Sequence, residues 1–193
     1  MFDLEPATDT LSRLVEGVRD DQLDAPTPCE RMTVGDLLDH VDELAQAFAR
    51  AAVKAPQPGQ GRPEPDASRL GDSWRTRIPG HLAELAKAWR EETAWEGVTQ
   101  AGGVDMPGNV AAMVAVNEVL VHGWDLAVAT GQHFDYEPDL LTWAGRFVGP
   151  VASENPGGSP GLFGPVIGAG QGSGELAAHL GLTGRDASWR APR

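Results

Sequence analysis

The residues best suited to chemistry lie in one long apolar segment of the chain. Glu118, His122 and Asp125 follow one another at i, i+4 and i+7, so on a helix they share one face. The surrounding residues, Asn109 to Thr130, are apolar almost all the way round, which is typical of a central helix. A buried carboxylate needs a partner, and no Lys or Arg occurs between Glu91 and Gly145. The pattern therefore predicts that a cation from elsewhere meets this face.

A third donor comes from an earlier segment. His40 lies at the edge of an apolar stripe that contains Leu37 and Leu44, where it can point between helices. Together with Glu118 and His122 it supplies two imidazoles and one carboxylate, the ligand count of an open catalytic zinc site. We therefore predict a divalent-metal site made of His40, Glu118 and His122. Zinc is the preferred ion, but nickel, cobalt, manganese or ferrous iron suit the same donors.

Asp125 lies one helical turn beyond His122 and is predicted to support the site from behind. Its carboxylate can accept the ring N–H of His122 that faces away from the metal. The alternative is that these residues form the solvent face of an amphipathic helix, with His40 hydrogen-bonded at the edge of the core. A solvent face normally carries Lys, Arg or Gln, whereas this one carries only potential ligands. Spacing alone leaves both interpretations open.

Helical periodicity accounts for most of the chain. Apolar residues recur at helical spacing over residues 4–18, 34–52, 82–89, 109–130 and about 138–151. The third of these helices can begin near Trp74 with a kink at Pro79. Thr33 and Asp36 resemble a capping box at the start of the second helix. Residues 95–106 fit either a hairpin or a long connection, and residues 175–182 fit a short final helix.

Helices joined by loops, with at most one hairpin, predict an all-α fold. We expect an up-and-down bundle of four or at most five helices, with long loops and a Gly/Pro-rich C-terminal tail. The bundle is expected to span residues 1–152 and to bind the metal, and the tail, residues 153–193, to pack on it. Residues 56–68 are rich in Pro, Gly, Gln and Glu and are predicted to form a flexible loop.

Composition narrows the possible partners. The 193 residues include 28 acidic and 15 basic side chains, a formal charge of −13, which disfavours nucleic acid or anionic lipid as a partner. The longest uninterrupted apolar stretch, Val110 to Val116, is shorter than the roughly 20 residues of a membrane span. The first residues carry Asp3 and Glu5 and no basic signal region. A cytoplasmic location is therefore the expectation.

Cys29 is the only cysteine, so an intramolecular disulfide and a multi-thiolate zinc site are excluded. A single cysteine beside two prolines is more often a small packed side chain than a nucleophile or ligand, and we assign it no role. His81, His133 and His179 are expected to lie at the surface.

Several segments resemble one family of metalloproteins. They are Thr27-Pro28-Cys29 leading into residues 33–40, then residues 118–127, Gly131-Gln132, and the tail segments 163–166 and 180–186. This set resembles the actinobacterial branch of the DinB-like metalloproteins, which includes the mycothiol-dependent maleylpyruvate isomerases. The resemblance implies a four-helix bundle with a divalent metal on His40, Glu118 and His122. It also implies a low-molecular-weight thiol, such as mycothiol, as cosubstrate. Met32 departs from the pattern, since similar sequences usually carry an aromatic residue there.

The preferred hypothesis is a divalent-metal-dependent thiol transferase or isomerase that acts on an electrophilic small molecule. A metal-dependent hydrolase is also open, because the same ligands can activate water. A third alternative is a stress-response or interaction module in which the metal is structural or absent. An open coordination position argues against a purely structural zinc, which normally has four protein ligands. Whether two bundles form a homodimer is not decided by the sequence.

Overall fold

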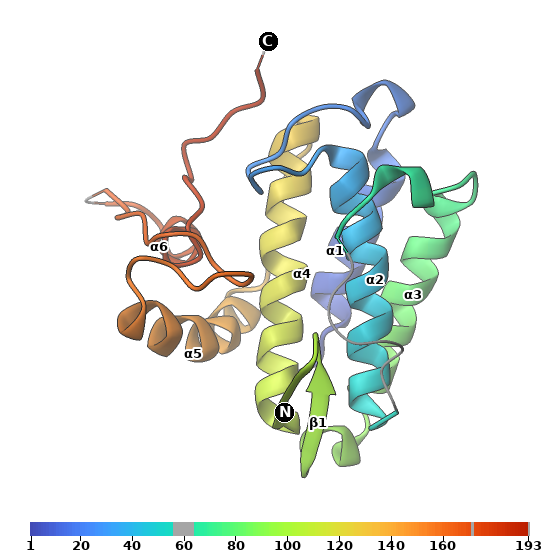
Figure 1. Cartoon of the computed structure of the whole chain (residues 1–193), viewed down its shortest axis with the longest axis vertical. Helices are drawn as coiled ribbons and strands as arrows, with labels where there is room; N and C mark the ends of the chain where they lie inside the picture. The colour runs from blue at the N-terminus through green and yellow to red at the C-terminus, as the bar shows by residue number, and fades with distance from the viewer. Residues whose placement is uncertain (56–63, 171, 193) are drawn as a thin grey trace.

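The computed structural model describes residues 1–55, 64–170 and 172–192, and within these residues it is mostly helical (Figure 1). The described helices are α1 (Glu5–Gly17), α2 (Val34–Ala52), α3 (Trp74–Ala88), α4 (Gly108–Thr130), α5 (Pro138–Glu154) and α6 (Glu175–Leu182). Between α3 and α4, β1 (Val98–Ala101) and β2 (Val104–Pro107) form an antiparallel hairpin with Val98 opposite Pro107. Of the two structures expected for residues 95–106, the hairpin is therefore the one that forms. Part of the predicted loop at residues 56–68 lies outside the described residues.

Local signals set the helix boundaries. Pro6 occupies the first turn of α1, where its missing N–H leaves no hydrogen bond unmade. The Oγ1 of Thr33 accepts the N–H of Asp36 at 3.2 Å, and the Oδ2 of Asp36 accepts the N–H of Thr33 at 3.0 Å. The predicted capping box is confirmed. The third helix begins at Trp74 and continues through Pro79, as the alternative start predicted.

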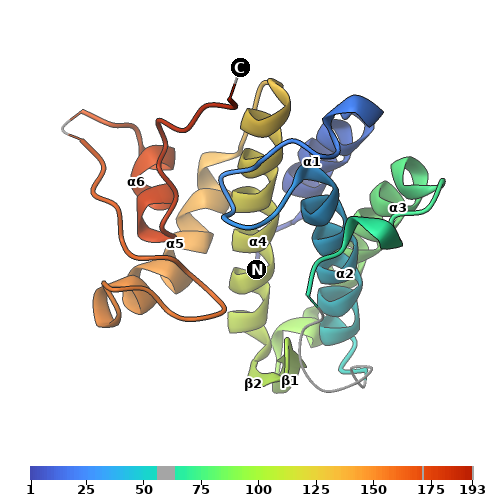
Figure 2. The same cartoon turned by 45° about the horizontal axis from the view of Figure 1, so that its top comes forward.

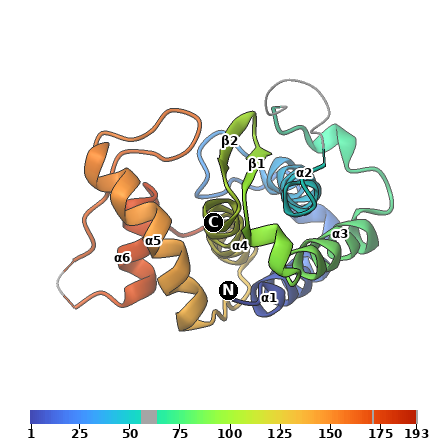
Figure 3. The same cartoon turned by 90° about the horizontal axis from the view of Figure 1, so that it is seen from below.

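Helices α1 to α4 surround one apolar core. Helix α1 packs against α3 and α4, and α2 packs against the same two helices, so that α1 and α2 lie at opposite corners (Figure 3). The core takes one fully buried leucine or more from every one of these helices, including Leu11, Leu37, Leu82 and Leu126. The predominantly helical fold predicted from periodicity is confirmed.

The predicted up-and-down arrangement, in which successive helices alternate in direction, is wrong, because α2 and α3 run in the same direction. Arg77, in the first turn of α3, donates from Nε to Asp42 in the first half of α2 at 2.9 Å. Trp89, just after α3, donates from Nε1 to the carbonyl of Phe48 near the end of α2 at 3.1 Å. About nine extended residues can return along the roughly 28 Å length of α2. The connection from residue 53 to 73 has more than nine residues, so it is long enough for α3 to begin beside the start of α2 and to run parallel to it.

Helix α4 is the central element of the fold. Figure 3 shows it between the other bundle helices on one side and the α5 and α6 pair on the other. Among the described helices, α4 alone is long and apolar enough to cross a membrane, but 89% of its most apolar window is buried inside the protein. Its all-round apolarity is therefore explained by the core that it occupies.

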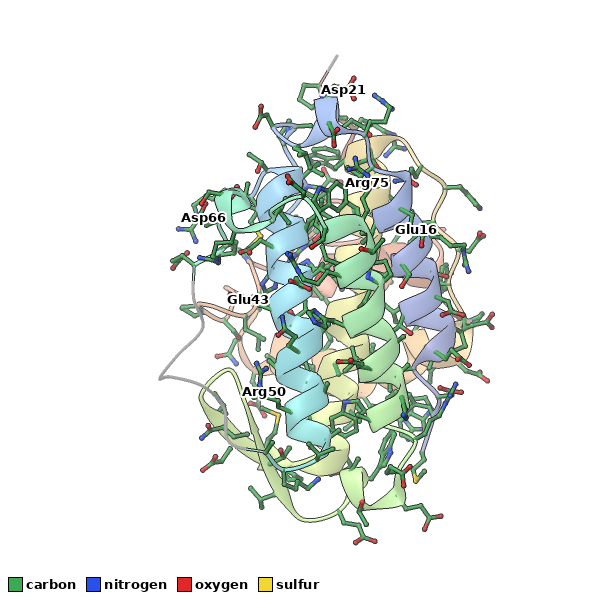
Figure 4. All side chains as sticks on the ribbon, turned by 90° about the vertical axis from the view of Figure 1, so that its right-hand side faces the viewer. Glu16, Asp21, Glu43, Arg50, Asp66 and Arg75 are labelled. Atoms are coloured by element: carbon green, nitrogen blue, oxygen red, sulfur yellow. The ribbon has the colours of Figure 1, made fainter. Side chains whose placement is uncertain are left out.

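The polar surface lies on the outer faces of the other helices. Figure 4 looks onto α1, α2 and α3 from outside, and the labelled carboxylates Glu16, Asp21 and Asp66 are exposed there. The capping carboxylate Asp36 also ties down the connection before α3, because its Oδ1 accepts the N–H of Ala67 at 2.9 Å. These contacts fix the first half of α2, the part of the helix that carries His40.

The C-terminal segment docks on α4 through a buried histidine. Nε2 of His179, on α6, lies 2.9 Å from Oδ1 of Asn117 on α4. The side chain is only 5% exposed, so the expectation of a surface position for His179 is wrong. Burial lowers the pKa of His179 to about 4.

This histidine predicts a pH-dependent stability. Between about pH 6.5 and pH 4, His179 is protonated in the unfolded chain but neutral in the folded chain. The free energy of unfolding therefore decreases as the pH falls through that window. At about pH 5 the loss from this group is expected to be about 2 kcal/mol relative to pH 7.5. Urea denaturation of the protein and of His179→Gln at both pH values measures it. Equal pH dependence in the two proteins would contradict the prediction.

Candidate metal centre

Two antiparallel helices bring the three predicted ligands together. His40 lies in the first half of α2, while Glu118 and His122 lie one turn apart in the middle of α4. Helices α2 and α4 are packed neighbours that run in opposite directions (Figure 1), and the two segments that carry these residues lie side by side. The three residues are 3%, 7% and 5% exposed, so their polar atoms face the interior of the bundle. The alternative of a solvent face on α4 is thereby excluded.

The two histidines meet at one carboxylate oxygen. Nε2 of His40 lies 3.7 Å from Oε2 of Glu118, and Nε2 of His122 lies 3.4 Å from the same oxygen. The imidazole centroids are 4.8 Å apart and the ring planes are perpendicular, at 90°. One ligand atom from each of the three residues lies within 4.8 Å of the other two.

These separations fit a divalent cation. With metal–ligand bonds of about 2.0–2.2 Å, neighbouring ligand atoms of a tetrahedral zinc site lie about 3.3–3.6 Å apart. The two nitrogen–oxygen separations at Glu118 are close to that range, and they exceed the roughly 2.7–2.9 Å of a charge-assisted hydrogen bond. Two imidazoles and one carboxylate also form the donor set of an open catalytic site. The donor types and the two nitrogen–oxygen separations at Glu118 are therefore those that a divalent ion requires.

Asp125 lies behind His122, where the sequence predicts it. Its Oδ2 is 3.1 Å from Nδ1 of His122, the ring nitrogen on the side away from Glu118. Burial acts to lower the pKa of His122, but hydrogen bonds to Asp125 and Glu118 outweigh it, and the pKa is raised. Asp125 is therefore able to hold the ring with Nε2 turned toward Glu118.

Arg185 supplies the cation that the sequence required but did not locate. It reaches Asp125 from the C-terminal segment, with Nη2 3.0 Å from Oδ2. Burial acts to lower the pKa of Arg185, yet Asp125 and Cys29 outweigh it, and the pKa is raised. The absence of basic residues from the central segment was the one signal that a partner must come from far along the chain.

Cys29 lies beside the centre without belonging to the predicted ligand set. The connection between α1 and α2 crosses α4 (Figure 2), and it carries Cys29 within 4.8 Å of a ligand atom of His122 and of Asp125. The side chain is half-buried. Of the other histidines, His133 is 84% exposed as expected, while His81 contacts Asp42 at 2.7 Å on the far side of α2.

Comparison with known proteins places the chain in a family. Residues 4–127 match the family model described as the mycothiol maleylpyruvate isomerase N-terminal domain. The chain belongs to this family. His40, Glu118, His122 and Asp125 all lie inside the matched residues, whereas His179 and Arg185 lie beyond them.

Two curated relatives of this family member come from Mycobacterium tuberculosis. They are the uncharacterized protein MT0763 of strain CDC 1551 / Oshkosh and the uncharacterized protein Rv0738 of strain ATCC 25618. Each is 32% identical to this chain over 154 residues, which cover 75% of the chain and 76% of the relative. Their names state no activity.

Two solved structures share the fold. One is the mycothiol-dependent maleylpyruvate isomerase, with a TM-score of 0.55, and the other is a histidine-to-alanine mutant described under the same name, with a TM-score of 0.57. Each is 21% identical to this chain, and each match covers 79% of this chain and 66% of the solved one. The likeness confirms the fold over just under two thirds of the isomerase chain.

Proposed function

We propose that this family member is a divalent-metal-dependent thiol transferase or isomerase acting on an electrophilic small molecule. One observation carries the proposal: two imidazoles from different helices meet at one buried carboxylate oxygen at separations that suit a metal ion. The family to which the chain belongs supports a low-molecular-weight thiol, mycothiol, as the cosubstrate. Zinc is the preferred cation, and nickel is an alternative with the same ligands.

Each residue of the centre has one task. His40 and His122 would hold the cation through Nε2, and Glu118 would hold it through Oε2 while balancing its charge. Asp125 keeps the Nδ1 side of His122 occupied, so that the ring presents Nε2 to the ion. A cation held by these three ligands would supply Lewis acidity, which lowers the pKa of a thiol and would make a nucleophile available near neutral pH.

Burial of the centre adds to this chemistry. The low exposure of His40, Glu118 and His122 excludes bulk water from the donor atoms, which strengthens their electrostatic interactions with a charged ligand. A thiol rather than hydroxide as nucleophile follows from the family relationship, because the donor set suits both.

Metal analysis combined with a thiol titration tests the proposal. Protein purified without chelator is expected to contain about one divalent ion per chain, measured by mass spectrometry. It is expected to consume an electrophile such as a maleyl or epoxide compound only when mycothiol is present. Removal of the ion should abolish this turnover, and added zinc should restore it.

Three outcomes would contradict the proposal. Protein without bound metal would remove its basis. Turnover of esters or amides without any thiol would favour a hydrolase. Strong destabilisation by chelator, with no turnover of any electrophile, would favour a structural metal. His133→Ala serves as the control variant, because this exposed histidine lies outside the centre and its replacement should change neither metal content nor turnover.

A further inference from the structure

The C-terminal segment enters the metal centre through a single side chain. Arg185 directs Nε and Nη2 to the two carboxylate oxygens of Asp125, at 3.4 and 3.0 Å. Its Nη1 donates to the carbonyl of Thr183 at 3.3 Å. All three guanidinium nitrogens thus contact protein atoms, an arrangement suited to holding a carboxylate in place rather than to capturing a substrate anion.

We infer that Arg185 is a positioning residue, which fixes the carboxylate of Asp125 and through it the imidazole ring of His122. The inference rests on the proposed metal centre and assigns part of it to a segment outside the matched family domain. On this inference the C-terminal segment contributes to metal binding through the contact of Arg185 with Asp125.

The geometry at Asp125 supports this assignment. Its side chain is fully buried, and its Oδ2 contacts both Nη2 of Arg185 and Nδ1 of His122, at 3.0 and 3.1 Å. A buried carboxylate with only a histidine beside it would be free to rotate about its terminal torsion. The planar, two-point contact from an arginine fixes the orientation of that carboxylate and places a positive charge beside it.

The backbone that delivers Arg185 is closely constrained. Gly184 adopts φ +81°, and a Cβ there would lie 2.7 Å from the Cα of Gly164 in a neighbouring loop segment of the tail. The N–H of Arg185 then donates to the carbonyl of Leu180 at 2.9 Å, closing the end of α6. The positive φ of Gly184 and its close approach to Gly164 both require glycine at residue 184. Together they set the direction of the backbone from which Arg185 points inward.

A double-mutant cycle on zinc affinity tests the inference. The dissociation constant is measured by competition with a chromophoric chelator for the full chain, for Arg185→Gln, for Asp125→Asn and for the double variant. Asp125→Asn is expected to weaken zinc binding by about 10- to 100-fold, as for other direct partners of a ligating histidine. Arg185→Gln is expected to weaken it about tenfold. In the Asp125→Asn background, Arg185→Gln should have no further effect, because the contact through which it acts is gone.

Two further variants make the test decisive. Arg185→Lys keeps the charge without the planar fork and should bind zinc more weakly than the native chain, so it answers the question if Arg185→Gln does not fold. Arg190→Gln, an exposed arginine of the same segment, should bind zinc as the native chain does.

The zinc affinities distinguish a positioning role of Arg185 from a purely structural one. Native zinc affinity in both Arg185→Gln and Arg185→Lys would overturn the inference, even if their melting temperatures fall, because a purely structural role lowers stability alone. Additive effects of Arg185→Gln and Asp125→Asn would also overturn it. Absence of zinc binding by the native chain would instead refute the proposed metal centre.

Discussion

Replacing His122 by alanine is expected to weaken zinc binding by about 100- to 1,000-fold. Zinc bound by four protein ligands is worth about 10–16 kcal/mol, so each ligand contributes about 3–4 kcal/mol, which corresponds to that factor. His122 contacts Glu118 on one side and Asp125 on the other. Its removal therefore also ends the contact through which Asp125 acts on the centre. Zinc content by mass spectrometry and competition with a chromophoric chelator measure the effect.

The matched variants distinguish ligand loss from general damage. His40→Ala should weaken zinc binding by a similar factor, because its Nε2 faces the same Oε2 of Glu118 from the opposite helix. His133→Ala should leave it unchanged, since that side chain is 84% exposed. If His122→Ala retains the native zinc content while folding normally, the three-ligand centre is refuted.

Replacing Asp125 by alanine is expected to lower the free energy of unfolding by about 3–5 kcal/mol. The change leaves the guanidinium of Arg185 buried without its carboxylate, and breaking one side of a buried ion pair carries that cost. Since a typical domain is stable by only about 5–15 kcal/mol, much of the margin would be lost. Urea denaturation of chelator-treated protein near neutral pH isolates this effect from metal binding.

An exposed ion pair provides the comparison. Asp21 contacts Arg19 at 3.0 Å, with side chains 72% and 65% exposed, so Asp21→Ala should change stability by less than about 1 kcal/mol. The double variant Asp125→Ala with Arg185→Met should recover much of the loss, because it removes the uncompensated charge. Equal stability of Asp125→Ala and the native chain would show that the buried pair does not hold the C-terminal segment in place.

Local structure was predictable because its causes are local. The start of α2 follows from Thr33 and Asp36, which satisfy each other's backbone N–H groups within one turn. The start of α1 follows from Pro6. The central position of α4 follows from its apolar girth, since only a helix covered on all sides can bury so many apolar side chains.

The direction of a helix depends on what the whole chain can reach. Periodicity predicts α2 and α3 equally well in either relative direction, because an apolar stripe has the same period when read from either end. The parallel arrangement is fixed by contacts such as Arg77 with Asp42, which form between residues 35 positions apart. A surface position for His179 was wrong for a related reason. Its partner, Asn117, lies 62 positions away and on another helix.

The sequence by itself determined the helices, the capping of α2 and the set His40, Glu118, His122 and Asp125, because donor type and helical spacing are properties of short segments. The tertiary structure decided that the ring nitrogens of both histidines face one carboxylate oxygen, and that Arg185 reaches Asp125 from 60 positions away. Metal–ligand geometry is set to within fractions of an ångström. Distances of that kind arise only when separate helices pack against one another, and no spacing along a chain can specify them.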